Sequence, residues 1–185
     1  KRQDINLLNT AVTNISLSNV QTISSSSLSD INTLGAAITA GTIAATTTIA
    51  TINVSGDTID FTTLDSEINR FDGFRIDPAI ATFNLADTTT VTLDDQSEVT
   101  DFISDVTSNL LVVSGASQAV TVTNSGAGGV DITVAEANDI TANTGGTVTA
   151  TVSDGDLDTL AGTGGGDGLA ARANAALTVT VTDTA

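Results

Sequence analysis

Four aspartates in the last fifth of the chain have the residue type and spacing that could bind a metal ion. Asp154, Asp156 and Asp158 alternate in a D-x-D-x-D sequence, and Asp167 follows in a glycine-rich stretch. Alternate carboxylates in a turn can converge on one hard cation, and calcium prefers such oxygen ligands. The sequence therefore predicts calcium as the one candidate cofactor. The open alternative is a solvated turn whose acids only keep the surface soluble.

The glycine-rich stretch strengthens the calcium hypothesis by resemblance. Residues 162–170, Gly-Thr-Gly-Gly-Gly-Asp-Gly-Leu-Ala, resemble the calcium-binding nonapeptide of RTX proteins, with Thr163 in place of the second glycine. Only one copy occurs, whereas tandem RTX copies share each ion. The later glutamate that an EF-hand loop requires is absent.

A second carboxylate cluster consists of Asp94, Asp95, Glu98 and Asp101. Negative side chains are favoured at a helix N-terminus, and we interpret the cluster in this way. Paired carboxylates could also serve a glycosidase. Sugar clefts usually contain aromatic platforms, however, and the chain has no Trp and no Tyr.

The missing residue types argue against enzymatic activity. The chain has no His and no Cys, the common general base and the common soft nucleophile. It has one Lys, Lys1, and no Walker-type phosphate loop. We therefore expect no catalytic residues, no enzymatic activity and no small-molecule substrate.

Net charge and composition limit the binding partners and the cellular location that we expect. The chain carries 22 acidic side chains against 5 basic ones, a net charge of −17. Nucleic acids need clustered basic residues, so they are not expected partners. No apolar run is long enough to cross a membrane. The start at Lys1 lacks an initiator Met, which suggests a processed or partial chain. The absence of cysteine fits either a cytosolic protein or a bacterial exoprotein, and we expect an extracellular or cell-surface location.

Segments that alternate apolar residues with Thr are typical of strands with one buried face. They occur at 48–54, 80–85, 90–93, 119–123, 130–134, 146–152 and 176–182. Acidic segments that begin near residues 29, 64, 94, 135 and 153 separate them. We expect one short helix near 95–107 and single helical turns elsewhere. The predicted fold class is mainly β, either β-solenoid-like or a β-sandwich with short helices or turns, and the alternative is two small β domains.

Several strands contain T-x-T, which raises the idea of ice or mineral binding by rows of hydroxyls. Such binding needs regular repetition on one flat face, whereas the T-x-T motifs are unevenly spaced along the chain. We interpret them as ordinary solvent-facing threonines.

Two terminal regions are candidates for assembly contacts. Residues 1–28 form an apolar segment that ends in a serine hinge, and residues 29–185 form a β-rich domain that could divide near residue 113. The N-terminal segment could be a strand donated to a neighbouring copy, or the first strand of its own domain. The clearest strand lies at the other end. The predicted assembly residues are Ile15, Leu17, Val20, Leu177, Val179 and Val181.

Residues 148–160 (V-T-A-T-V-S-D-G-D-L-D-T-L) and 177–185 (L-T-V-T-V-T-D-T-A) resemble repeat segments of very large bacterial surface proteins. These are the Thr/Val/Asp-rich exoproteins of adhesin, S-layer and cyanobacterial motility type. The resemblance implies an extracellular, repetitive, non-enzymatic role, often with calcium. We therefore predict a structural subunit of an extracellular filament, sheath or surface layer, which forms a homopolymer by strand addition. The alternative is a repeat module of a calcium-dependent adhesin that binds a surface or a glycan.

Overall fold

Strand pairing is parallel throughout the part of the chain that this computed structural model describes. Parallel strands need a crossover connection, usually a helix, and helices provide it here. The described residues are 15–16, 22–25, 27–41, 43–44, 51–56, 58–73, 82–86, 89–113, 115–123, 130–153, 156–163 and 168–179.

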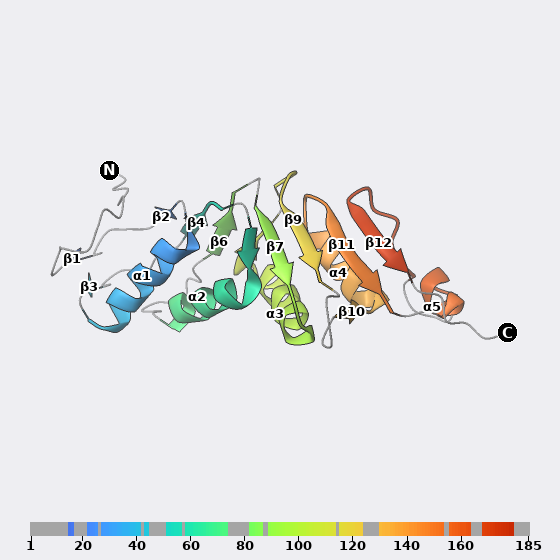
Figure 1. Cartoon of the computed structure of the whole chain (residues 1–185), viewed down its shortest axis with the longest axis horizontal. Coiled ribbons are helices and arrows are strands. Elements are labelled where there is room, and N and C mark those ends of the chain that lie inside the picture. The colour runs from blue at the N-terminus through green and yellow to red at the C-terminus, as the bar shows by residue number, and fades with distance from the viewer. Residues whose placement is uncertain are drawn as a thin grey trace.

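The strands form two main sheets and one short pair (Figure 1). The four-stranded sheet consists of β2 (Thr22–Ser25), β4 (Thr51–Val54), β6 (Thr82–Leu85) and β8 (Leu111–Val112), in this order. The six-stranded sheet consists of β5 (Thr58–Asp60), β7 (Thr90–Leu93), β9 (Ala119–Val122), β11 (Val148–Val152) and β12 (Ala175–Val179) in this order, with β10 (Asp131–Ile132) also paired with β11. The short pair joins β1 (Ile15–Ser16) to β3 (Ile43–Ala44).

Helices follow the strands and lie in a row along the molecule (Figure 1). They are α1 (Leu28–Thr39), α2 (Phe61–Gly73), α3 (Gln96–Thr107), α4 (Val134–Asn143) and the short α5 (Leu157–Ala161). Each of the first three helices contacts the next. Among the described residues, no helix combines the length and the apolar character that crossing a bilayer requires.

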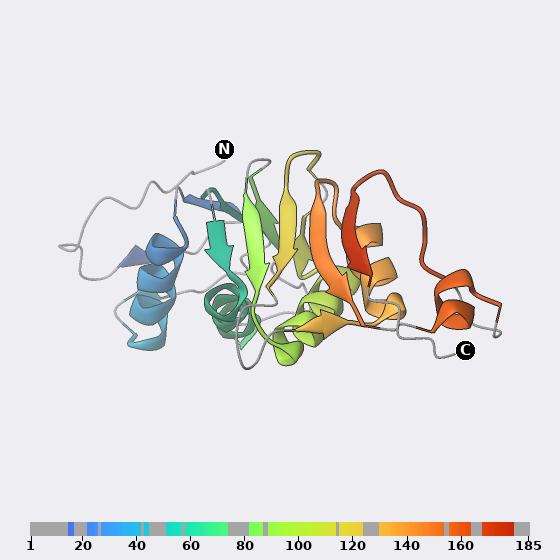
Figure 2. The ribbon, with the colours of Figure 1, turned by 45° about the vertical axis from the view of Figure 1, so that its right-hand side comes forward.

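A strand–strand–helix unit repeats along the chain. One unit is β4–β5–α2, and the next is β6–β7–α3. Each strand pairs with its counterpart in the following unit, so that Thr22 is in register with Thr51 and Thr51 with Thr82. The spacing is about 30 residues, within the range of repeat architectures. The strands of the six-stranded sheet therefore lie side by side along the long axis (Figure 2).

The predicted alternation of buried and solvent-facing residues is confirmed. In β4, β6, β7 and β9, every second side chain is buried. These side chains join residues from the helices in one core, which the sheets and the helix row enclose. Two edge-on aromatic pairs lie in it: Phe61 and Phe102 have ring centroids 5.6 Å apart, and Phe71 and Phe83 have theirs 6.0 Å apart.

The prediction of a mainly β fold, whether solenoid-like, a sandwich or two small β domains, is wrong. The protein is an α/β fold with parallel sheets. The helix expected near 95–107 is present as α3, and Asp95 caps it. Three of the acidic segments interpreted as single turns are helices of 12, 13 and 10 residues. A sandwich also needs antiparallel pairs, whereas here each parallel crossover requires a helix.

Candidate functional site

In the first repeat unit, the described residues include no counterpart of the strand that the next units contribute to the six-stranded sheet. Strand β2 ends at Ser25, and α1 begins three residues later. Ser27 caps this helix, because its hydroxyl oxygen accepts a hydrogen bond from the Asp30 N–H (3.3 Å). No described strand therefore lies on the outer side of β5, which pairs only with β7.

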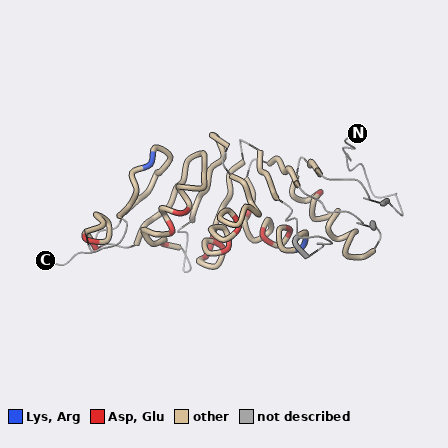
Figure 3. The backbone as a smooth tube through the Cα atoms, turned by 180° about the vertical axis from the view of Figure 1, so that it is seen from behind, with Lys and Arg blue, Asp and Glu red and all other residues tan. Residues whose placement is uncertain are grey.

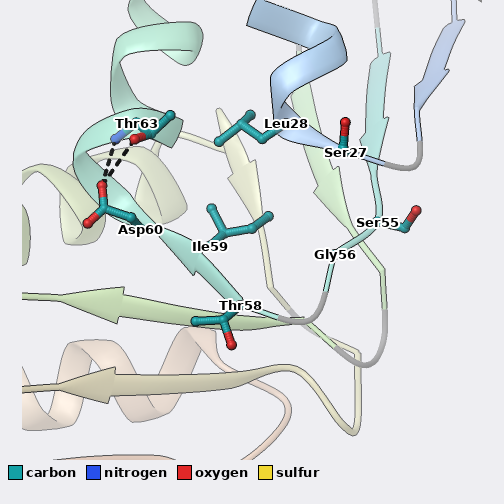
Figure 4. A pocket seen from close by; sticks show the side chains of 8 residues that line it. All are labelled: Ser27, Leu28, Ser55, Gly56, Thr58, Ile59, Asp60 and Thr63. Atoms are coloured by element: carbon teal, nitrogen blue, oxygen red, sulfur yellow. Dashed lines mark hydrogen bonds between the residues drawn. The ribbon is translucent and has the colours of Figure 1, made fainter.

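A shallow cavity of about 270 Å³, which we call the β5 groove, occupies this place. Half-buried Leu28 and buried Ile59 lie at its centre, as Figure 4 shows. Asp60 lies on one side of them and accepts hydrogen bonds from the N–H (3.1 Å) and the hydroxyl (3.2 Å) of Thr63. The other lining residues are Ser27, Ser55, Gly56 and Thr58.

The register of the sheet shows which backbone groups face the β5 groove. The Thr89 carbonyl accepts a hydrogen bond from β9, so the backbone of Thr90 turns the other way, toward β5. Thr90 is in register with Thr58, and a residue in a parallel ladder bonds the neighbours of its register partner. Ile59 therefore directs its backbone toward β7, and Thr58 and Asp60 direct theirs to the open edge.

Helix α1 is held beside the groove by a buried carboxylate. Glu67 of α2 accepts a hydrogen bond from the Asn32 amide of α1 (2.7 Å) and forms an ion pair with Arg70 (2.9 Å). Burial raises the pKa of Glu67, while the Arg70 charge and the Asn32 hydrogen bond oppose this increase. A side chain at Gly35 would meet Arg70 Cδ at 2.8 Å, which explains the glycine at this close contact. These contacts fix α1, and with it Leu28, against α2.

The opposite edge of the six-stranded sheet is β12. Val148 donates its N–H to the Asn174 carbonyl (2.8 Å), so Asn174 directs its backbone toward β11. Along a strand the direction alternates, and the backbones of Ala175, Leu177 and Val179 therefore face the free edge. The side chains of Leu177 and Val179 pack against the core but are only half-buried. Among the described strands, only β11 pairs with β12.

Two of the predicted assembly residues, Leu177 and Val179, thus lie in an edge strand. Ile15 lies in β1, whose described partner is β3 of the same chain. Residues Leu17, Val20 and Val181 lie outside the described residues. An assembly role for the six residues stays a prediction.

The predicted metal ligands are only partly described. Asp156 caps α5 by accepting a hydrogen bond from the Asp158 N–H (2.9 Å), and Asp158 accepts one from the Thr163 hydroxyl (2.8 Å). Asp154 and Asp167 lie outside the described residues. Within the described ranges, no three acidic side chains are grouped so that they could hold an ion. Calcium binding stays a prediction.

The acidic side chains gather on the helices (Figure 3). Strands β2, β4, β6, β7, β8, β9, β11 and β12 carry no charged side chain. Between α2 and α3, burial raises the pKa of Asp65, and the charge of Asp101 raises it further. The folded protein therefore holds this proton more tightly than the unfolded chain does. Above the raised pKa, the ionised Asp65 lowers the stability of the fold. This destabilisation disappears as the pH falls through the raised pKa and the carboxyl group becomes protonated.

Threonines cover the outer face of the six-stranded sheet in rows. The T-x-T motifs are unevenly spaced along the chain because the connections between the strands differ in length, whereas the strands themselves are in register. The rows are Thr92–Thr121–Thr149, Thr58–Thr90 and Thr151–Thr178.

Among the described residues, the fold is that of a repeat α/β protein whose six-stranded parallel sheet ends in β5 and β12. Comparison with protein-family models, with curated proteins and with solved structures gives no match for the chain.

Proposed function

We propose that the chain is a structural subunit of an extracellular filament, sheath or surface layer, in which copies join by β-strand addition and apolar stacking. The observation that carries this proposal is that the described six-stranded sheet ends in β5 on one side and in β12 on the other, each paired along one edge only and both running in the same direction, while the two-residue β10 also pairs only with β11. An unpaired edge offers a row of backbone donors and acceptors to another chain.

The two edges differ from each other, and this difference favours an open polymer. A contact between two unlike surfaces is heterologous, and it produces a filament unless the rotation between copies closes a ring. Edge strands that must not associate usually carry charges or proline. Strand β12, Ala-Ala-Leu-Thr-Val, has neither.

Net charge sets the conditions for assembly. Each copy carries a net charge of −17, so copies repel one another over distances comparable with the Debye length, about 8 Å at physiological salt. Added salt screens this repulsion, and assembly should therefore strengthen as ionic strength rises. The proposed extracellular location is supported by the cysteine-free, acidic composition and by the resemblance to surface-protein repeats.

The test uses Leu177, whose backbone N–H faces the free edge of β12. The variants Leu177→Pro and Leu177→Ala lose similar side-chain contacts, but only proline also removes the N–H and places a ring at the edge. We expect Leu177→Pro to raise the concentration needed for assembly at least about tenfold over Leu177→Ala, the equivalent of one lost hydrogen bond. Sedimentation and electron microscopy at several salt concentrations measure the concentration at which each variant assembles.

Circular dichroism must first show that both variants remain folded. Equal assembly of the two variants would mean that the β12 edge is not used. A wild-type chain that stays monomeric at every salt concentration would contradict the proposed function as a whole.

A second candidate function is a module that binds a neutral surface or glycan. The uncharged threonine rows favour it, because they present aligned hydroxyls on a molecule that is otherwise strongly acidic. Neutral polysaccharides offer matching hydroxyl groups and no charge to be repelled.

This second function predicts that the chain binds neutral glycans on an array or in a pull-down with insoluble polysaccharide. Thr149 is exposed at the end of the longest row, Thr92–Thr121–Thr149. Thr149→Lys should weaken binding about tenfold by interrupting the hydroxyl contacts. The matched change at exposed Thr100, on α3, should leave binding unchanged. Binding that responds equally to both changes would exclude the threonine face.

A further inference from the structure

We infer that the β5 groove receives β12 of a second copy, so that copies join head to tail with one polarity. The inference rests on the proposed function and adds to it which edge binds which. It also assigns the groove, which the assembly residues predicted from the sequence did not include.

Strand direction permits this joint without any change in the subunit. All strands of the six-stranded sheet run parallel, and β5 and β12 are its two ends. Placing β12 of one copy beside β5 of the next therefore continues the same parallel sheet across the joint. Two β5 edges, or two β12 edges, could meet only as an antiparallel pair or with the two faces of the sheet inverted, and either arrangement would break this continuity.

The backbone groups at the two edges are complementary. Ala175, Leu177 and Val179 face outward from β12, and Thr58 and Asp60 face outward from β5. With Leu177 opposite Ile59, the Leu177 N–H faces the Thr58 carbonyl and the Leu177 carbonyl faces the Asp60 N–H, as the parallel ladder requires. The five residues of β12 are then centred on the groove.

This register also buries the apolar side chains that each edge leaves half-covered. Leu177 points to the core side of its sheet and would meet Leu28 and Ile59 at the centre of the groove. The exposed residues Ala176 and Thr178 would remain on the outer face, beside Thr58 and Asp60. Burial of one leucine side chain contributes about as much as a tenfold change in affinity or more.

Charge supports the same pairing. Residues 168–179 contain no acidic side chain and one basic one, Arg172, in a chain whose net charge is −17. The β5 groove contributes the carboxylate of Asp60. The acidic helix row is therefore the surface on which copies repel, while β12 itself has no charged side chain that would repel Asp60.

The absence of cysteine in the sequence permits a direct test by disulfide formation. In the proposed register, Ala176 lies opposite Thr58 across the joint. Neighbouring strands are about 4.8 Å apart, within the Cα separation that a disulfide spans. Equimolar Thr58→Cys and Ala176→Cys chains, mixed under assembly conditions and mildly oxidised, should give one covalent heterodimer. A chain that carries both changes should give a ladder of covalent oligomers.

Matched controls identify the contact. Each single variant oxidised alone should give little covalent dimer. Thr58→Cys mixed with Thr149→Cys should not cross-link, because Thr149 is exposed but lies inside the sheet. Iodoacetamide should modify Thr58→Cys more slowly after assembly than before it. A Thr58→Cys homodimer, or an alkylation rate that assembly does not change, would overturn the inference.

The outcomes separate the inference from the function on which it rests. Filaments that form without the heterodimer would retain the structural role and exclude the β12–β5 joint, leaving another segment as the occupant of the groove. Chains that neither assemble nor cross-link would contradict both.

Discussion

Replacing Gly146 by alanine is expected to lower the free energy of unfolding by about 3 kcal/mol or more, at the upper end of the range for overpacking. A Cβ at this position would lie 1.9 Å from the backbone oxygen of Gln118. That backbone cannot easily retreat, because the buried Gln118 side chain is itself anchored. Its amide donates to the Leu85 carbonyl, and its oxygen accepts from the Gly115 N–H (2.7 Å).

Denaturant unfolding measures this loss, and Gly56→Ala is the matched control. A Cβ at Gly56 meets its nearest neighbour, a side-chain atom of Ile59, at 3.7 Å, which is ordinary contact. The control should therefore be neutral or stabilising by up to about 1 kcal/mol, because alanine restricts the unfolded chain more than glycine does. Similar losses in both variants would contradict the close approach at Gly146.

Replacing Phe102 by alanine should cost about 3–5 kcal/mol, the usual range for removing a buried aromatic ring. Phe102 is fully buried in α3, and its ring packs edge-on against Phe61 at the start of α2. The core is close-packed, and its other buried side chains are mostly aliphatic, so the cavity is expected to be filled only in part. The loss of the ring should weaken the packing between the two adjacent repeat units that contain α2 and α3.

The control for Phe102 is Leu157→Ala on α5. Leu157 is 53% exposed, and its truncation should change stability by no more than about 0.5 kcal/mol. The loss of unfolding free energy in Phe102→Leu should fall between those of the two alanine variants, since leucine retains part of the buried volume. A Phe102→Ala variant as stable as the Leu157→Ala variant would show that the aromatic pair does not hold the units together.

The strands could be predicted from the sequence because their signal is local. In residues 90–93, Thr-Val-Thr-Leu, the buried Val91 and Leu93 alternate with threonines, and the period of two appears directly. The direction of pairing could not be predicted, because parallel and antiparallel strands with one buried face show the same alternation. The uneven starts of the acidic segments also concealed the repeat.

The helices were underestimated because their residues are poor helix formers. Between 61 and 73, threonines and acids separate the apolar side chains, and the segment resembles a turn by composition. Its buried residues nevertheless recur at helical spacing, and packing against the sheets overrides propensity. These residues are Phe61, Leu64, Ile68 and Phe71.

The β5 groove was missed for a different reason. It lies where the described part of the first unit has no second strand, and the alternating patterns of the sequence predict strands that are present. One signal was available: Ser27 stands three residues before Asp30 and just ahead of the apolar residues Ile31 and Leu34, as an N-cap does. It predicts a helix that begins directly after β2, with no room for a second strand.

The orientation of the strands has a mechanical consequence. They lie across the long axis, so the hydrogen bonds between them run along it (Figure 1). Tension on the two ends would pull neighbouring strands apart along their hydrogen bonds, so that strand pairs open one after another. It would not load many hydrogen bonds in shear at the same time. Within a copy the strand pairs are also linked by the chain's own crossover connections and share one core, whereas a joint between copies has only the strand pair and its side chains. A stretched fibre would therefore part between copies, and each copy would survive the break folded and ready to rejoin.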